Sequence, residues 1–243
     1  MKKCILILGM HRSGTSLVAG LLHLSGISSG KNLLNPKNEN PKGFFEIEQL
    51  YHVNEEILKA SGTRWNMLKK PILDSIEKTI YKSKIKEIIN SEFKADEVFV
   101  IKDPRICVLL SLYMEIFEEL NIKVFPVIVR RNFAEIAYSL NTRNNYNLYN
   151  GYSLSKHYYQ SIKTSLLDKF YISLKYVEII GSPQITLDKV FKFVELQKPD
   201  LDSKVFDFVD RNLYRNRLNF LIKFIIKTFG EIKYQYFKFK FGL

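Results

Sequence analysis

Apolar runs rich in β-branched residues recur along the chain and alternate with segments whose apolar positions repeat at helical spacing. The apolar runs cover Lys3–Gly9, Glu97–Lys102, Lys123–Arg130 and Leu174–Ile180. Helical spacing covers Thr15–Leu24, Glu48–Ala60, Ile106–Leu120 and Ala134–Leu140. Strands that are apolar throughout are covered on both faces, and strands that alternate with helices pair in parallel. The pattern therefore predicts one α/β domain with a central parallel sheet flanked by helices.

Composition and length agree with a globular domain of this kind. The 243 residues are 46% hydrophobic and 26% charged, which excludes disordered and fibrous classes. No apolar run reaches the ~18 residues of a membrane-spanning helix. The apolar stretch after Lys3 holds five residues, fewer than the roughly 7–15 at the centre of a signal peptide. We therefore interpret this stretch as a buried first strand.

Cysteine use favours a reducing compartment. The chain holds two cysteines, Cys4 and Cys107, which cannot build a disulfide framework. It also contains no Asn-X-Ser/Thr glycosylation acceptor. Both features favour a cytoplasmic protein.

Positive charge is concentrated toward the carboxyl end. The net charge is +12, and residues 211–243 hold eight basic side chains against one acidic side chain, Glu231. The stretch Leu218–Phe229 could form a helix that is apolar around most of its circumference, and Lys233–Phe241 alternates basic with aromatic residues. We therefore divide the chain into a domain over 1–217 and a basic, aromatic tail over 218–243 that is helical in part.

Two interpretations of this tail stay open at this level. In the first, the tail is a helix packed on the core, with a charged and aromatic terminal extension. In the second, the tail contacts an anionic membrane, because basic and aromatic side chains together suit that surface. The second interpretation would place the protein at the inner face of the membrane.

The segment Gly9–Ser16, with the sequence Gly-Met-His-Arg-Ser-Gly-Thr-Ser, joins the first predicted strand to the first predicted helix. A glycine turn followed by a helix N-terminus presents backbone N–H groups and about half a positive charge to an anion. A nucleoside-triphosphate P-loop would have lysine at the position of Thr15. Arg12 lies inside the loop instead, so the sequence favours an anion shorter than a triphosphate as the ligand. The alternative, that this segment is a plain strand-to-helix turn without a ligand, is less favoured.

These residues carry a resemblance to the bacterial sulfotransferases that use 3′-phosphoadenosine 5′-phosphosulfate (PAPS). In that family a loop of the type Arg/Lys-Ser-Gly-Thr-Ser/Thr binds the 5′-phosphosulfate. The matching residues here are Arg12, Ser13, Gly14, Thr15 and Ser16. The resemblance implies a P-loop-like α/β fold and PAPS as the donor, without a metal.

A second element of the family is a strand that ends in arginine, followed eight residues later by a serine on the next helix. Both side chains bind the 3′-phosphate in that family. The predicted strand Lys123–Arg130 leads to Arg131, and Ser139 stands at the required separation. Spacing prefers Arg131 over its neighbour Arg130. The family usually has proline where this chain has Phe133.

The segment Asn40–Glu46 precedes a predicted helix, at a place where related sulfotransferases have a glutamate. The resemblance implies that Glu46 is the general base that removes the proton of the acceptor hydroxyl, a contribution of ~10²–10⁴-fold. Glu46 could instead cap the helix, where its negative charge is favourable. Glu48 and His52 are the alternatives for the base.

The predicted strand Glu97–Lys102 also ends in charged residues, in the sequence Lys-Asp-Pro-Arg. This motif resembles the tyrosylprotein branch of the family, which implies that Lys102 stabilises the transferring group together with Arg12. Sulfuryl transfer needs cations around the equatorial oxygens and the leaving phosphate. We expect Asp103 to orient Lys102 or Arg105 in an ion pair, and Arg105 could contact donor or acceptor.

Two weaker matches extend the resemblance to about Arg217. Tyr176–Glu178 is similar to a Tyr-Glu position of the family, and Arg211–Arg215 is similar to the basic segment that ends many bacterial members. The residues after Arg217 lie outside the resemblance.

The four histidines do not predict a metal site. His11 lies within the anion loop, and we expect it to be non-catalytic. His23, His52 and His157 show no metal-ligand spacing with each other or with either cysteine. No metal is therefore predicted.

Three functions are compatible with these features. The first is a PAPS-dependent sulfotransferase acting on a hydroxyl of a glycan or lipid-linked glycan, in surface glycan or polysaccharide synthesis, without a nucleic-acid partner. The second is a P-loop kinase of a small molecule, against which Thr15 argues. The third is a non-enzymatic basic protein that binds nucleic acid or membrane through residues 211–243. The first is preferred, because two motifs of the family occur in the right order.

Overall fold

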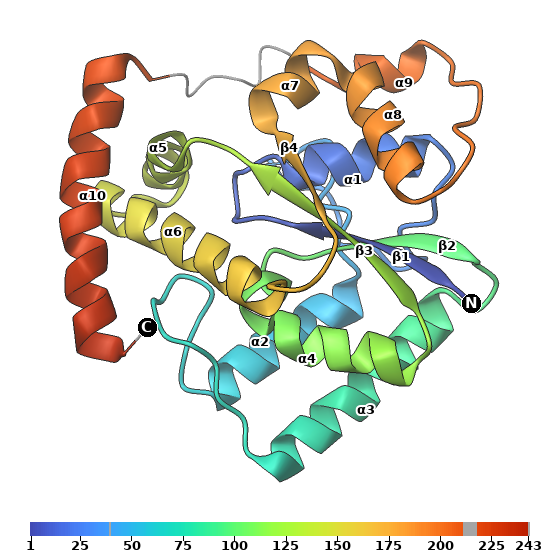
Figure 1. The fold of residues 1–243 in the computed structure, drawn as a ribbon, viewed down its shortest axis with the longest axis horizontal. Coiled ribbons are helices and arrows are strands. Elements are labelled where there is room, and N and C mark those ends of the chain that lie inside the picture. Colours follow the sequence, from blue (N-terminus) through green and yellow to red (C-terminus); the bar gives the residue numbers. More distant parts are fainter. Residues whose placement is uncertain (39, 211–217, 243) are drawn as a thin grey trace.

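The computed structural model describes residues 1–38, 40–210 and 218–242, which form a parallel sheet flanked by helices (Figure 1). The strands are β1 (Lys3–Leu8), β2 (Val98–Lys102), β3 (Lys123–Arg130) and β4 (Ile172–Lys175). They pair in the order β2-β1-β3-β4, with every neighbouring pair parallel. The predicted α/β class with a central parallel sheet is therefore confirmed.

Strand β1 lies between β2 and β3, and its side chains fill the cores on both faces of the sheet. Cys4, Leu6 and Leu8 join one cluster of buried apolar side chains, and Ile5 and Ile7 join the other. Successive residues of a strand point to opposite faces, so an apolar run without polar breaks is what a doubly covered strand needs.

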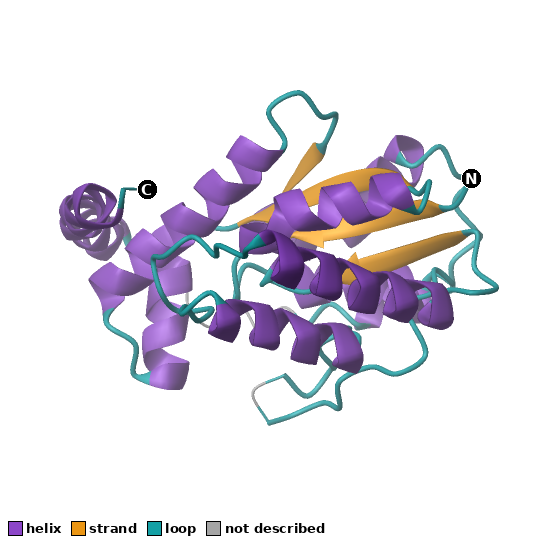
Figure 2. Ribbon diagram, turned by 90° about the horizontal axis from the view of Figure 1, so that it is seen from below, coloured by secondary structure: helices purple, strands orange, loops and turns teal. Residues whose placement is uncertain are grey.

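The helices divide between the two faces of the sheet, and Figure 2 shows this layering. One face packs against α2 (Glu48–Ala60), α3 (Ser75–Glu92), α4 (Ile106–Glu119), α5 (Phe133–Asn144) and α6 (Leu148–Ser165). The other face packs against α1 (Thr15–Leu24), α7 (Tyr176–Gly181), α8 (Pro183–Phe193) and α9 (Lys204–Asp207). The strands' carboxyl ends point toward the side of the molecule that carries α5 (Figure 1).

The predicted strand Leu174–Ile180 is wrong in most of its length. Strand β4 ends at Lys175, and the short helix α7 begins at Tyr176. Ile179 and Ile180 are buried while Val177 is 55% exposed, an alternation that a one-sided short helix explains. Apolar runs of this length do not distinguish a strand from a buried helix.

The tail forms one helix, α10 (Phe220–Phe241), which continues through the basic and aromatic stretch. It packs against α6 and α5, with Ile226 and Tyr234 buried. Helices α10 and α6 approach closely at Gly230, where a Cβ would lie 2.5 Å from the ring of Tyr152 in α6. The inner face of α10 therefore matches the interpretation of a helix packed on the core.

Two expectations about the chain's last part fall on residues 211–217. The predicted division after residue 217 and the basic segment Arg211–Arg215 both lie outside the described residues. Where helices are described, each is too short or too polar to cross a bilayer.

Substituting Gly230→Ala should lower the free energy of unfolding by about 1–3 kcal/mol, because the new methyl overpacks the seam against the buried Tyr152. The matched control is Gly181→Ala in α7, where a Cβ would meet nothing within 4 Å. That change should be neutral or stabilising by up to about 1 kcal/mol, as alanine favours helix over glycine. Urea unfolding measures the free energy of unfolding of both variants. Equal changes in the two variants would contradict the close packing of Gly230 against Tyr152.

Candidate functional site

The loop Gly9–Ser16 connects β1 to α1 at the carboxyl end of the central strand, where ligands bind in sheets of this kind. Arg12 and Gly14 both adopt left-handed backbone conformations, with φ of 69° and 102°. Gly14 is the residue before α1, and a Cβ on it would lie 2.5 Å from the Tyr176 ring. The turn therefore requires glycine there, and it leaves the first N–H groups of α1 facing the space beyond the loop.

A cavity of about 400 Å³ opens beside this loop. Its basic side chains come from the loop, from the start and end of α5, and from the segment before α2. Among the described residues of the lining, these are Arg12, Arg131, Arg143 and Lys42, and the acidic one is Asp210. Gly14, Thr15 and Ser16 complete the wall on the loop side. This balance of charge fits an anionic ligand.

Arg131 and Ser139 both reach the loop at Arg12. The Arg131 Nη1 donates to the Arg12 carbonyl oxygen at 3.1 Å, and the Arg12 Nε donates to Ser139 Oγ at 3.0 Å. Arg130 points elsewhere, with its guanidinium 4.8 Å from the centre of the Tyr159 ring. Of the two neighbouring arginines, Arg131 is the one that lines the cavity.

Glu135 holds Arg131 from the next turn of α5. Its Oε2 lies 3.3 Å from Arg131 Nε, and its Oε1 lies 2.7 Å from Lys223 Nζ of α10. Glu135 is 2% exposed, so both cations neutralise a carboxylate that water does not reach. A side chain of the tail helix thus belongs to the support of the cavity wall.

Lys102 and Glu46 form a buried ion pair next to the loop. Lys102 Nζ also donates to Ser16 Oγ at 3.2 Å. Neither Lys102 nor Glu46 lines the cavity, but Ser16 does. A series of side-chain contacts therefore leads inward from Ser16 at the cavity wall through Lys102 to Glu46.

Further polar groups hold this pair from behind. Arg105 Nη1 lies 3.5 Å from Glu46 Oε2 and 2.9 Å from Asp103 Oδ1, and its Nε binds Glu55. Asp103 Oδ2 accepts a hydrogen bond of 2.9 Å from Asn54. Of the two partners expected for Asp103, the structure shows Arg105.

The environment of Glu46 changes its acidity. Burial raises the pKa of the Glu46 carboxyl above its usual value, and the cations Lys102 and Arg105 oppose this rise. A raised pKa moves a carboxylate toward the range in which a general base works near neutral pH.

The other roles considered for this segment do not match the geometry. Helix α2 begins at Glu48, with Ile47 at its N-cap position and no side-chain cap, so Glu46 does not cap it. Glu48 and His52 contact each other at 4.0 Å on an exposed face of α2.

His11 faces the core, with its ring 4.7 Å from Trp65 and 6.3 Å from Tyr158, centre to centre. Burial lowers the pKa of His11 well below its usual value, and the nearby Arg105 and Lys102 lower it further. Within the described ranges, no three His, Cys, Asp or Glu side chains come together as metal ligands would.

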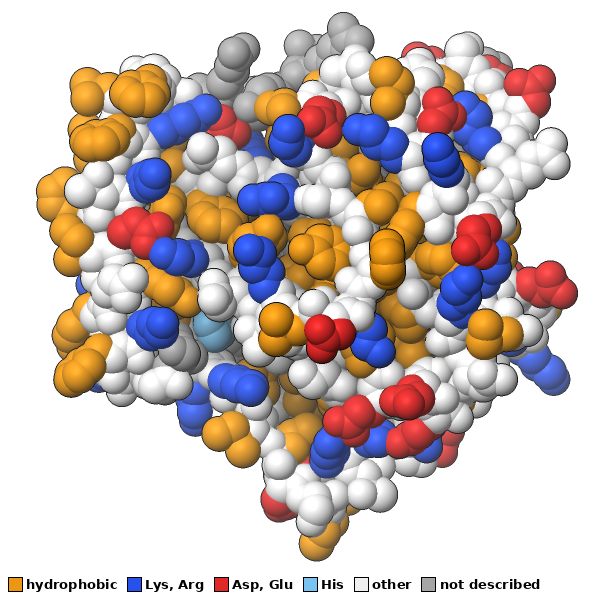
Figure 3. Space-filling view, in the orientation of Figure 1, with side chains coloured by type: hydrophobic (Ala, Val, Ile, Leu, Met, Phe, Trp, Pro, Cys, Tyr) orange, Lys and Arg blue, Asp and Glu red, His pale blue; other side chains and the backbone are white. Residues whose placement is uncertain are grey.

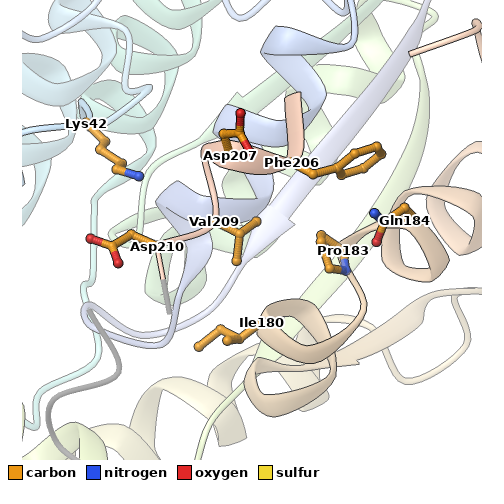
Figure 4. Close-up of a pocket in the computed structure, with 8 residues that line it drawn as sticks. All are labelled: Lys42, Ile180, Pro183, Gln184, Phe206, Asp207, Val209 and Asp210. Atoms are coloured by element: carbon orange, nitrogen blue, oxygen red, sulfur yellow. The ribbon is translucent and has the colours of Figure 1, made fainter. Parts of the chain in front are cut away.

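A second cavity, of about 680 Å³, adjoins the first and shares Lys42, Ile180 and Asp210 with it. Figure 4 shows Lys42 and Asp210 on one side of this space, opposite Pro183 and Gln184. The Lys42 ammonium donates to the Phe208 carbonyl oxygen at 2.7 Å. The segment before α2 is thereby tied to the segment after α9.

The structure brings together most of the residues that the sequence singled out. Arg12, Gly14, Thr15, Ser16 and Arg131 line the cavity. The other predicted site residues, Ser13, Ser139, Lys102 and Glu46, are buried next to it. The Ser13 hydroxyl has no hydrogen-bond partner among the described residues.

Sequence reasoning missed two of the cations in the cavity, Arg143 and Lys42. Arg143 stands four residues after Ser139 in α5, so it lies one turn further along the same helix face. That spacing was a usable signal. Lys42 lies in the segment Asn40–Glu46, which the sequence already placed at the site through Glu46, but its own side chain was not singled out.

Comparison with known proteins identifies the fold. No family model and no curated protein matches this sequence. Among solved structures, the sulfotransferase domain from the curacin biosynthetic pathway superposes with a TM-score of 0.52, at 16% identity over 86% of this chain and 78% of that one. The chain therefore has the fold of a sulfotransferase domain, and the resemblance is confirmed at that level.

Two other structures are similar in part. The sulfotransferase domain of the Synechococcus PCC 7002 olefin synthase gives a TM-score of 0.49 at 14% identity, covering 95% of this chain and 96% of that one. Sulfotransferase STF9 from Mycobacterium avium gives 0.45 at 11% identity, covering 90% of this chain and 69% of that one.

We expect His11 to stay neutral below pH 6.5, where an ordinary histidine becomes protonated, since burial and neighbouring cations disfavour its charged form. The ring signals of His11 in an NMR titration measure this, with His11→Asn used to assign them. A titration midpoint near 6.5, the ordinary value for histidine, would contradict the buried placement.

Proposed function

We propose that the protein transfers the sulfuryl group of PAPS to a hydroxyl group of a carbohydrate, releasing 3′,5′-ADP. The observation that carries this proposal is the meeting of Arg131 and Ser139 with the anion loop at Arg12, in a chain with the fold of a sulfotransferase domain. In a PAPS site the loop would bind the 5′-phosphosulfate, and Arg131 and Ser139 would bind the 3′-phosphate of the same donor. A site for a nucleoside triphosphate would not need the second anion-binding position that Arg131 and Ser139 would form.

The cavity suits the donor in charge and in its hydrogen-bond donors. The first N–H groups of α1 and the hydroxyls of Ser13, Thr15 and Ser16 would bind the 5′-phosphosulfate. The Ser13 hydroxyl is buried beside the cavity and has no hydrogen-bond partner among the described residues. Arg131 and Ser139 would bind the 3′-phosphate, and Arg143 adds a third positive or polar group on the same side of the cavity.

The reaction needs a base on one side of the sulfur and cations on the other. The acceptor oxygen forms a bond to sulfur, the bond from sulfur to the 5′-phosphate oxygen breaks, and the electron pair leaves with the phosphate. The proton of the acceptor hydroxyl passes to Glu46. Arg12 and Lys102 stabilise the charge on the sulfuryl oxygens and the leaving phosphate.

The pair Lys102–Glu46 connects these two tasks. Lys102 contacts Ser16 at the cavity wall and Glu46 behind it, so one ammonium lies between the donor loop and the base. An acceptor hydroxyl must therefore enter beside Lys102 to reach Glu46.

Further features agree with a carbohydrate acceptor, a cytoplasmic location and a reaction other than that of a kinase. A carbohydrate acceptor agrees with the resemblance and with Asn38 and Asn40 in the cavity lining, whose amides can bind hydroxyl groups. A cytoplasmic location agrees with Cys4 and Cys107, which are both free thiols. The kinase alternative is disfavoured because Thr15 occupies the wall where a P-loop lysine would stand.

The donor assignment predicts that 3′,5′-ADP binds at least tenfold more tightly than 5′-AMP, a difference of about 1.4 kcal/mol. Calorimetric titration measures both ligands. Arg131→Ala should abolish the difference, because it removes the cation that we propose binds the 3′-phosphate. Arg130→Ala is the matched control and should retain it, since Arg130 lies over Tyr159. Equal binding of the two nucleotides to the wild type would refute the assignment.

The base assignment predicts that Glu46→Gln lowers kcat by ~10²–10⁴-fold while the Kd for 3′,5′-ADP stays within about twofold. Transfer from radiolabelled PAPS to a set of mono- and disaccharides measures the rate. Glu48→Gln, two residues on and exposed, should leave kcat unchanged. In the wild type kcat should fall with acid at a pH above the ordinary carboxyl range, because burial raises the pKa of Glu46. Full activity in Glu46→Gln would exclude this role.

A further inference from the structure

Helix α10 has a second apolar face that is largely exposed to solvent, although Phe229 on this face lies 5.4 Å from the Tyr149 ring of α6, centre to centre. Six residues, spaced by three or four positions and so placed along one side of the helix, make up this outer stripe. They are Leu221, Ile225, Phe229, Ile232, Tyr236 and Phe239. Their side chains are between 40% and 92% exposed. The inner face, with Ile226, Gly230 and Tyr234, is the one that meets α5 and α6.

Figure 3 shows hydrophobic side chains along the outer edge of α10, with lysines between them. Scattered single apolar residues are normal on a protein surface, but a continuous stripe marks a contact surface. Burying one Leu, Ile or Phe side chain contributes roughly 1.5–3 kcal/mol. The outer stripe therefore has a large free energy to gain from a partner.

The charges on α10 select the partner. The helix carries five lysines and one glutamate, Glu231. That glutamate already binds Lys156 and accepts a hydrogen bond of 2.9 Å from Tyr152, and Lys223 pairs inward with Glu135. The other four lysines are Lys227, Lys233, Lys238 and Lys240, all exposed. The charge that α10 offers outward is therefore positive.

The arrangement of these lysines disfavours a second copy of the chain as the partner. Lys233 and Lys240 border the outer stripe on one side, and Lys227 and Lys238 lie further round the helix. Two such stripes face to face would bring lysines together. An anionic bilayer instead attracts each lysine near its surface by about 1 kcal/mol. Aromatic side chains next to lysines are also typical of helices that lie in a bilayer interface.

We propose that the outer stripe of α10 docks the protein on the surface of an anionic phospholipid bilayer, with the helix axis in the plane of the interface. This inference goes beyond the proposed reaction and does not depend on it. An in-plane helix also agrees with the finding that no described helix could cross a membrane.

Docking would hold the candidate site close to the membrane. Lys223 of α10 binds Glu135, and Glu135 binds Arg131 of the cavity wall. The strands' carboxyl ends also point toward the side that carries α5 and α10 (Figure 1). An acceptor attached to a lipid of that bilayer would then lie on the side of the molecule toward which these strand ends point, where the candidate site lies.

Flotation of the full chain with vesicles tests the proposal. The wild type should float with vesicles of equal parts phosphatidylcholine and phosphatidylglycerol, at least tenfold more than with phosphatidylcholine alone. Ile232→Ser with Phe239→Ser should lower binding at least tenfold. The matched control is Leu167→Ser with Phe170→Ser, two residues 78% and 93% exposed in the loop before β4, which should bind as the wild type does.

A second pair of variants tests the charge. Lys233→Gln with Lys240→Gln should weaken flotation several-fold, and added salt should weaken the wild type in the same way. Lys59→Gln with Lys94→Gln, exposed lysines away from α10, should not. Thermal unfolding confirms that each variant folds.

Three outcomes would overturn the proposal. The first is absence of flotation with anionic vesicles, and the second is equal loss of binding in the control double variant. The third is a dimer in light scattering that Ile232→Ser with Phe239→Ser dissociates, because a second copy would then occupy the outer stripe. None of these outcomes bears on nucleotide binding, so this proposal and the proposed function can fail separately.

Discussion

Two carboxylates and two cations lie buried together where β2 ends, and each can stay there because the others neutralise it. Glu46 and Asp103 face Lys102 and Arg105, and all four are at most 5% exposed. Removing one member of a buried pair costs several kcal/mol, since an unpaired charge remains out of water. The cluster therefore fixes three parts of the chain relative to one another: the end of β2, the segment before α2 and, through Ser16, the anion loop.

A second buried cluster acts in the same way behind Arg131 of the cavity wall. Glu135 is shared between Arg131 and Lys223, so the end of β3, the start of α5 and the tail helix meet at one carboxylate. The tail thus has two distinct faces: an inner face bound into the support of the cavity, and an outer face with apolar and basic side chains in water.

The sequence predicted the parts of the fold that depend on local pattern. Three strands and α1 were recognised because buried parallel strands and a helix after a glycine turn leave unbroken signals. Helices α3 and α6 were not predicted. The first is rich in charged residues and buries few apolar side chains, and the second buries Ser153, Ser155 and His157, which hide its apolar period. Motif residues adjacent in sequence lie together beside the cavity, and their roles there stay predictions, whereas the Lys42 side chain was not singled out within its segment.

The sharing of Glu135 has a consequence for motion in the native state. Of the described side chains on α10, only Ile226 and Tyr234 are fully buried apolar anchors, so this helix is expected to detach at a lower free energy than the sheet. Detachment would withdraw Lys223 from Glu135, while Arg131 would stay paired with that carboxylate. The carboxylate would then hold Arg131 more tightly, and an incoming phosphate would compete with it. Amide exchange in α10 and occupancy of the cavity by an anion are therefore thermodynamically linked.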